Sequence, residues 1–223
     1  MQKIIIVGNG IAAKILYGYI KNDKRYKVIA FSVDYKYINQ SKLFGLDVVD
    51  LNKLKDLYSV NGYKLILGVG YNNINKDRED IFKRVKNFGY RVETYIHLDA
   101  RIYNENCIGE GSIIFANSVV EPYSTIGKNS VIWANCTIAH HSSIEDNCWI
   151  ASGSVIAGEA KIKSNCFLGV NSTVVNKVVV DKFNIIGAHA MVSKNTKENE
   201  VYLARSGEKH RFGASDYVHY FGI

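Results

Sequence analysis

The sequence predicts an α/β domain followed by a solenoid of short parallel strands, and three observations support that prediction. Before residue 96, short apolar runs alternate with helical segments, as in an α/β fold. From residue 96 to residue 192, an aliphatic side chain recurs at every sixth position. The 223 residues are 47% hydrophobic with one proline, a composition that excludes disordered chains and disulfide miniproteins. The expected domains are residues 1–95 and 96–197, with an aromatic-rich C-terminal tail over 198–223 that is expected to pack on a neighbouring chain.

The first domain is expected to contain a small parallel sheet. The pattern predicts strands at 3–7, 27–31, 64–69 and 91–96, and helices at 14–21 and 77–88. This alternation supplies only half of a dinucleotide-binding fold, so we expect a Rossmann-like βαβαβ module.

A glycine-rich turn in this domain is a candidate ligand site. Gly8-x-Gly10-x-x-Ala13 follows a strand and precedes a helix, and Asp34 follows about 20 residues later, which is the spacing of the dinucleotide fingerprint. Glycines let the backbone approach a phosphate, and the helix N-terminus offers amide donors. Gly70 and Asn72 follow the next predicted strand at the same sheet edge. A nucleotide-linked sugar, NAD and a tight turn without ligand all stay open, although the missing second half-fold counts against NAD.

The six-residue repeat predicts the second domain. Seventeen consecutive hexads carry an aliphatic residue, and a small residue usually follows it four positions later. This period fits a solenoid in which each hexad is a short strand and a turn, and three hexads close a triangular coil of 18 residues. Cys136, Cys148 and Cys166 occupy the small positions, so we expect them to be interior packing residues. The pattern resembles that of the hexapeptide-repeat acyltransferases, which implies a left-handed parallel β-helix and a trimer.

His140 and His141 are the candidate reactive groups of the repeat. Neither occupies an inward position, so both are expected to project outward, where a histidine is either a surface residue or a base that works near neutral pH. Gly158 lies 18 residues after His140 and is expected to stack beside it in the next coil. A glycine there leaves room for a thioester and exposes an N–H that could stabilise an oxyanion.

The net charge, the length of the apolar runs and the cysteine spacing limit the ligands and the location that the sequence predicts. The net charge of +7 suits small anionic ligands, whereas interspersed acidic residues argue against a nucleic-acid surface. The apolar run Ile4–Val7 is too short for a membrane span or a signal peptide, so we expect a cytoplasmic protein without membrane insertion. The four cysteines form no C-x-x-C pair, which predicts neither a disulfide framework nor a metal site.

The chain up to about residue 196 resembles the bacterial sugar acyltransferases of the PglD/NeuD type, most closely at 138–144 and 165–172. The resemblance implies a homotrimeric acetyl-CoA-dependent N-acetyltransferase of a nucleotide-linked amino-deoxy sugar in surface glycan synthesis, with His140 as catalytic base. It implies acetyl-CoA contacts at Gly158, Trp149, Val170 and Ala188. It implies nucleotide-sugar contacts at Gly8, Gly10, Ile11, Ala12, Asp34, Gly70 and Asn72.

Two positions depart from the family pattern. His141 stands where the family has an acidic residue, and Trp149 stands where a second histidine is common. His140 is therefore expected to lack its carboxylate partner, unless Glu121, Glu145 or a residue of an adjacent subunit takes that place. Three alternatives remain: O-acetylation of a sialic-acid-like sugar, a nucleotide-binding oxidoreductase, and a non-catalytic β-helix that binds a nucleotide. A missing carboxylate favours an amine acceptor, because a hydroxyl needs deprotonation more than an amine does.

Overall fold

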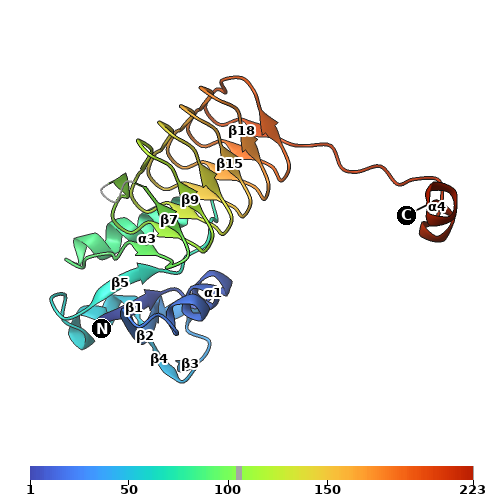
Figure 1. Cartoon of the computed structure of the whole chain (residues 1–223). Helices are drawn as coiled ribbons and strands as arrows, with labels where there is room; N and C mark the ends of the chain where they lie inside the picture. Colours follow the sequence, from blue (N-terminus) through green and yellow to red (C-terminus); the bar gives the residue numbers. More distant parts are fainter. Residues whose placement is uncertain (104–106, 223) are drawn as a thin grey trace.

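The computed structural model describes residues 1–103 and 107–222. Residues 104–106, which fall within the predicted solenoid, and residue 223 lie outside the described part of the chain. Figure 1 shows an α/β part beside the first coils of a long solenoid, and an arm that leaves the last coil.

The α/β part contains a five-stranded sheet in the order β3-β4-β2-β1-β5. Its strands are β1 (Gln2–Val7), β2 (Tyr26–Val33), β3 (Lys42–Leu43), β4 (Leu46–Asp50) and β5 (Lys64–Leu67), and all pairs are parallel except β3 with β4. Its helices are α1 (Ile11–Ile20), α2 (Leu54–Leu57) and α3 (Lys76–Asn87), with 3₁₀ turns η1 (Tyr35–Tyr37) and η2 (Leu51–Lys53). The strands predicted at 3–7, 27–31 and 64–69 and both predicted helices are therefore confirmed, whereas β3, β4 and α2 were not predicted.

The strand predicted at 91–96 is wrong as a single element. Val92 makes an isolated bridge to Leu65 of the α/β sheet, but Tyr95 and Ile96 form β6, which pairs with the solenoid. Main-chain hydrogen bonding explains the division. The N–H of Tyr95 donates to the carbonyl of Ser112, so Tyr95 belongs to the first coil of the β-helix. The domain boundary near residue 95 stays a prediction.

The solenoid is a left-handed parallel β-helix with three faces, as predicted. Face 1 consists of β6 (Tyr95–Ile96), β8 (Ile113–Ile114), β11 (Val131–Ile132), β14 (Trp149–Ile150), β17 (Phe167–Leu168), β20 (Ile185–Ile186) and β22 (Val201–Tyr202). Face 2 consists of β7 (Arg101–Ile102), β9 (Val119–Val120), β12 (Thr137–Ile138), β15 (Val155–Ile156), β18 (Thr173–Val174) and β21 (Met191–Val192). Face 3 consists of β10 (Thr125–Ile126), β13 (Ser143–Ile144), β16 (Lys161–Ile162) and β19 (Val179–Val180).

The hexad residues build the interior of the β-helix. Every aliphatic hexad position from Ile114 to Val192 is at most 2% exposed, and stacked partners such as Ile132 and Ile150 lie in register. Cys136, Cys148 and Cys166 are buried in the same core, which confirms them as interior packing residues. Burial of this continuous apolar column is what stabilises a stack of coils that each bury little alone.

Among residues 1–103 and 107–222, the α/β part covers the outer surface of face 1 and not those of faces 2 and 3. Outward side chains of face 1, such as Ile113, Val131 and Trp149, share a buried cluster with Leu16 of α1. Outward side chains of face 2 remain open, as Val155 shows with 37% exposure. This arrangement leaves faces 2 and 3 free for ligands or further chains.

The C-terminal arm extends from β22 into solvent. It ends in α4 (Ala214–Phe221), which lies far from the coils in Figure 1 and buries none of its residues. The expectation that this tail packs on a neighbouring chain stays a prediction. None of the helices in residues 1–103 and 107–222 is both long enough and apolar enough to cross a membrane.

Candidate functional site

His140 lies on the corner between faces 2 and 3, in the turn that joins β12 to β13. Its side chain is exposed, and its ring rests on Gly158 in the next coil. A Cβ built on Gly158 would lie 2.7 Å from both Cε1 and Nε2 of His140, closer than real Cβ contacts. The structure therefore brings together the two residues that the 18-residue spacing placed side by side, and only glycine allows the approach.

The main-chain N–H of Gly158 is a free donor beside this imidazole. The flanking amides are used, because Ala157 N–H donates to Val174 and Glu159 N–H donates to His140. Gly158 N–H meets no acceptor among the described residues. A free amide next to a histidine is the combination that can hold an oxyanion while a proton is transferred.

His141 is the observed partner of the His140 ring. The two Nδ1 atoms lie 3.2 Å apart, so one ring donates and the other accepts. If His140 carries its proton on Nδ1, its Nε2 is left with a lone pair on the side that faces Gly158. Tyr123 supports this pair, because its ring centroid lies 4.8 Å from that of His141.

The two carboxylates expected as substitutes do not reach the imidazole. Glu121 accepts a 2.8 Å hydrogen bond from the main-chain N–H of His140, and so holds the turn rather than the ring. Glu145 pairs with Lys163 at 2.8 Å and accepts from Ser164, and these contacts hold its pKa below the usual value against the opposing effect of burial. Within the described chain, the ring of His140 therefore has an imidazole as its partner, where the resemblance predicts an acid.

Val170 and Ala188 lie across face 2 from His140. Both are exposed, and they occupy successive turns between faces 1 and 2. The open outer surface of face 2 runs between these turns and the His140 corner, so an extended ligand lying along face 2 could touch both edges.

Trp149 does not belong to that surface, which corrects its expected place among the acetyl-CoA contacts. Its side chain points outward from face 1, where it is 5% exposed under the α/β part. Tyr71 covers it with a ring-centroid distance of 5.1 Å. The docked α/β part leaves this indole no surface for a ligand on face 2.

The glycine turn of the α/β part is held by close backbone contacts. A Cβ on Gly8, whose φ is 122°, would lie 2.5 Å from the carbonyl oxygen of Gly68. A Cβ on Gly68 would lie 2.6 Å from the Cα of Ala13. These contacts lock the ends of β1 and β5 together, where the strand order changes direction and ligands of open α/β sheets bind.

Several main-chain amides at this edge have no acceptor within the described chain. Helix α1 has no side-chain cap and no acidic residue in its first turn, and its first internal bond is donated by Lys14 to Gly10. The N–H groups of Ile11 and Ala12 are therefore unpaired within the described chain, as at any helix N-terminus. Gly10 and Gly70 face open space, since a Cβ on either would meet nothing within 4 Å.

Asp34 has a partner that sequence reasoning missed. Its Oδ1 forms an ion pair with Nη2 of Arg84 at 2.7 Å, and the same nitrogen donates to Asn52 at 2.5 Å. The pair is partly exposed at the end of β2, and Asn72 is exposed on the loop after β5. Arg84 carries no local sequence signal for this role, because only the packing of α3 brings it to β2.

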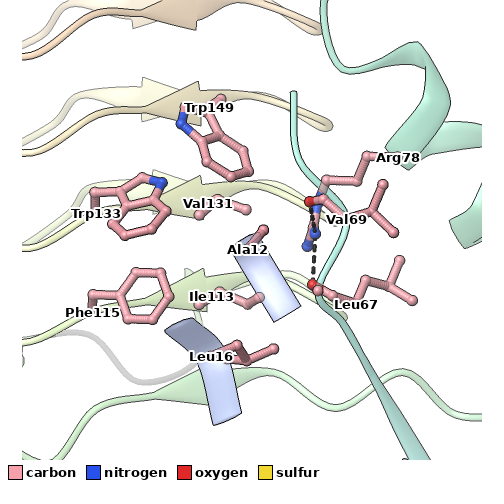
Figure 2. A pocket seen from close by; sticks show the side chains of 11 residues that line it. Ala12, Leu16, Leu67, Val69, Arg78, Ile113, Phe115, Val131, Trp133 and Trp149 are labelled. Carbon is pink, nitrogen blue, oxygen red and sulfur yellow. Dashed lines mark hydrogen bonds between the residues drawn. The ribbon is translucent and has the colours of Figure 1, made fainter. Parts of the chain in front are cut away.

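A small apolar cavity separates the glycine turn from face 1. It is lined by Ala12, Leu16, Leu67, Gly68, Val69, Arg78, Ile113, Phe115, Val131, Trp133 and Trp149. Figure 2 shows Arg78 at one side of this cavity, hydrogen-bonded to Leu67 and Val69. No group of three or more potential metal ligands occurs in residues 1–103 and 107–222.

Comparison with known proteins gives one family match. The model of the family described as "GMPPB C-terminal domain" matches residues 91–202, about half of the chain and most of the β-helix. None of the curated proteins matches the sequence.

Solved structures share the fold over nearly the whole chain. The acetyltransferase domain of PglB from Neisseria gonorrhoeae superposes with a TM-score of 0.81 at 21% identity, covering 90% of this chain and 96% of that chain. A mutant of perosamine N-acetyltransferase from Caulobacter crescentus, solved with CoA and GDP-perosamine, has the same TM-score and identity and covers 90% and 93%. WeeI from Acinetobacter baumannii has a TM-score of 0.72 at 17% identity, covering 90% and 96%. These similarities establish the α/β part and the β-helix as a shared architecture.

Proposed function

From the premise that this chain belongs to the GMPPB C-terminal domain family through residues 91–202, we propose that it is an acetyl-CoA-dependent N-acetyltransferase of a nucleotide-linked amino-deoxy sugar. The observation that carries the proposal is the exposed His140 ring resting on Gly158, whose N–H has no acceptor in the described chain. The titles of two structural neighbours, an acetyltransferase domain and a perosamine N-acetyltransferase solved with CoA and GDP-perosamine, support the same chemistry.

In the proposed reaction the sugar amine attacks the carbonyl carbon of the acetyl thioester directly. Nε2 of His140 accepts a proton from the attacking amine, and the N–H of Gly158 hydrogen-bonds the oxyanion of the tetrahedral intermediate. The intermediate collapses with cleavage of the C–S bond, and the thiolate of CoA takes the proton back from His140. His141 keeps the His140 proton on Nδ1 through the 3.2 Å contact, so that Nε2 is the basic atom.

Acetyl-CoA is proposed to lie along face 2. Gly158 would contact its thioester, and the exposed turns at Val170 and Ala188 would contact the rest of the molecule from the opposite edge. Face 2 suits this role because the α/β part leaves its outer surface open.

The nucleotide sugar is proposed to bind at the glycine turn. The unpaired amides at the start of α1 would hold its diphosphate, with backbone contacts from Gly8, Gly10, Ile11, Ala12 and Gly70. Asp34 would accept hydrogen bonds from the nucleoside or sugar, with Arg84 holding its carboxylate in place, and the Asn72 amide would accept or donate there.

A homotrimer belongs to the same proposal. His140 stands on the corner between faces 2 and 3, whereas the glycine turn belongs to the part that covers face 1, on the other side of the same prism. A second copy is therefore needed to bring a bound amino sugar to His140, and the resemblance to trimeric acyltransferases favours three. A cytoplasmic location is also part of the proposal, and the reduced thiols of Cys136, Cys148 and Cys166 suit it.

An amine acceptor is preferred to the hydroxyl of a sialic-acid-like sugar. His140 contacts an imidazole rather than a carboxylate, so its ring lacks the negatively charged neighbour that would stabilise the positive charge formed when it takes a proton. A sugar O-acetyltransferase is thus the second candidate function.

The test is a free-thiol release assay with acetyl-CoA and a panel of UDP-, dTDP- and GDP-linked 3- and 4-amino-6-deoxy sugars. The wild type is compared with His140→Ala and with the control His219→Ala, which removes an exposed histidine of α4. We expect turnover on one sugar, a loss of at least about 100-fold in His140→Ala, and no change in the control. Turnover that survives His140→Ala would discard this base, and no turnover on any amino sugar would favour a hydroxyl acceptor or a non-catalytic β-helix.

A further inference from the structure

Arg78 is a buried cation whose hydrogen-bond acceptors in the described chain are all main-chain oxygens. Its residue is 1% exposed on α3, and its guanidinium donates to the carbonyls of Leu67 at 2.8 Å and Val69 at 3.2 Å (Figure 2). It also donates to Asn129 at 3.1 Å and to Gly111 at 3.3 Å, on the corner between faces 3 and 1. One side chain thus joins the loop after β5 to two coils of the β-helix.

The charge of Arg78 has no counter-ion in the described chain. None of the ion pairs among residues 1–103 and 107–222 includes it, and the neighbouring Glu79 pairs with Lys83 and accepts from Asn165. Burial lowers the pKa of Arg78 to about 9, so the guanidinium is still charged at neutral pH. A buried cation without a counter-ion is costly, because carbonyl dipoles replace only part of its hydration.

The hydrogen bond to Val69 orients a donor of the candidate nucleotide site. A trans peptide points its C=O and N–H in opposite directions, so the N–H of Gly70 points away from Arg78 when the Val69 carbonyl points toward it. That N–H is unpaired within the described chain. Ala12, in the first turn of α1, lines the same cavity as Arg78, so the charge lies across a small cavity from the start of α1.

We infer that Arg78 is a positioning residue of an anion site: it fixes the Val69–Gly70 peptide and supplies the positive charge that a bound diphosphate neutralises. The ligand class is a nucleoside diphosphate or its sugar ester, and this identification rests on the proposed function. Arg78 contacts the loop and not the ligand, so it acts through the Gly70 amide and through the field of a charge that is itself buried in surroundings of low dielectric constant.

Isothermal titration calorimetry tests this inference. The probes are inorganic pyrophosphate, the nucleoside diphosphate that the wild type prefers among UDP, dTDP and GDP, the matching uncharged nucleoside, and acetyl-CoA. The variants are Arg78→Met, Arg78→Lys and the control Glu79→Gln, which alters the adjacent contact to Asn165. We expect Arg78→Met to weaken diphosphate and pyrophosphate binding about tenfold more than nucleoside binding, with acetyl-CoA affinity unchanged. Arg78→Lys should retain the preference for diphosphate over nucleoside, and Glu79→Gln should match the wild type.

Equal losses for the diphosphate and the nucleoside would overturn the inference, because a purely structural clamp affects both ligands alike. If Arg78→Met does not fold, Arg78→Gln, which keeps a hydrogen-bond donor and removes the charge, decides the matter: a loss for the diphosphate that exceeds the loss for the nucleoside supports the inference, and equal losses reject it. A wild type that binds neither pyrophosphate nor any nucleoside diphosphate also rejects it. Diphosphate binding that depends on Arg78, in a protein that acetylates none of the amino sugars, would support Arg78 and reject the proposed function.

Discussion

Replacing Gly158 with alanine tests the His140–Gly158 pair most directly. The new Cβ would lie 2.7 Å from Cε1 and Nε2 of His140, whereas ordinary contacts are 3.4–4 Å, so the ring must retreat by about 0.7 Å. Misplacement of a catalytic group by about 1 Å costs about 100-fold in rate, or about 2.7 kcal/mol of transition-state stabilisation. The added methyl group also crowds the free N–H of Gly158. We therefore expect kcat to fall about 100-fold.

The fold should tolerate this substitution. Gly158 does not have a left-handed backbone conformation, and the exposed His140 side chain can swing outward. The expected loss of stability is about 1 kcal/mol or less, which is a shift of a few degrees in Tm. A loss of about 100-fold in the kcat of Gly158→Ala could therefore not be explained by unfolding of the variant.

The assay measures kcat and KM by thiol release, together with Tm. Gly18→Ala is the matched control, since Gly18 lies inside α1 and a Cβ there meets nothing within 4 Å. This control should keep wild-type kcat and gain about 1 kcal/mol from helix propensity. If Gly158→Ala keeps kcat within about threefold while His140→Ala loses activity, the reaction does not take place between the imidazole and this glycine.

Further predictions concern His141, which is the partner of the His140 ring, the core residue Ile150 and the buried thiol of Cys148. Restoring an acid with His141→Asp should raise kcat several-fold, because a carboxylate stabilises the imidazolium form of His140; an unchanged kcat in steady-state assays would show that His141 does not orient the base. Ile150→Ala removes a side chain that is 0% exposed in the middle of the β-helix and should cost about 2–5 kcal/mol in urea unfolding, so a loss below about 1 kcal/mol would contradict the packed interior. Burial raises the pKa of the Cys148 thiol well above its usual value, so this thiol should resist alkylation until the protein unfolds. Because the pKa is higher in the folded state, this contribution to stability is present below the pKa of the unfolded thiol and is lost as pH rises above it, which unfolding curves at increasing pH would show.

The repeat made the β-helix and its reactive corner predictable. In a solenoid each coil contacts only its neighbours, so residues 18 apart are adjacent whatever the rest of the chain does. His140 and Gly158 could therefore be paired by counting along the chain. The interior positions of Cys136 and Cys166 followed from the same register.

The α/β part was predictable only in outline. Strong apolar runs located β1, β2 and β5, but the short strand β4 carries no comparable run and owes its place to pairing with β2. Residues 91–96 read as one strand because four of the six are β-branched or aromatic and none is glycine or proline, although main-chain hydrogen bonds assign their two ends to different sheets.

Contacts between the two parts were decided by tertiary packing alone. Outward positions of the β-helix repeat with the same period on all three faces, and nothing in that period says which face another domain covers. Docking on face 1 buried Trp149, which the repeat left as a free outward residue. The same docking brought Arg78 of α3 between the loop after β5 and the coils at Gly111 and Asn129. The hydrophobic period along the chain thus determined the solenoid and its adjacent coils, whereas long-range packing, which no local pattern encodes, determined the surroundings of the candidate nucleotide site.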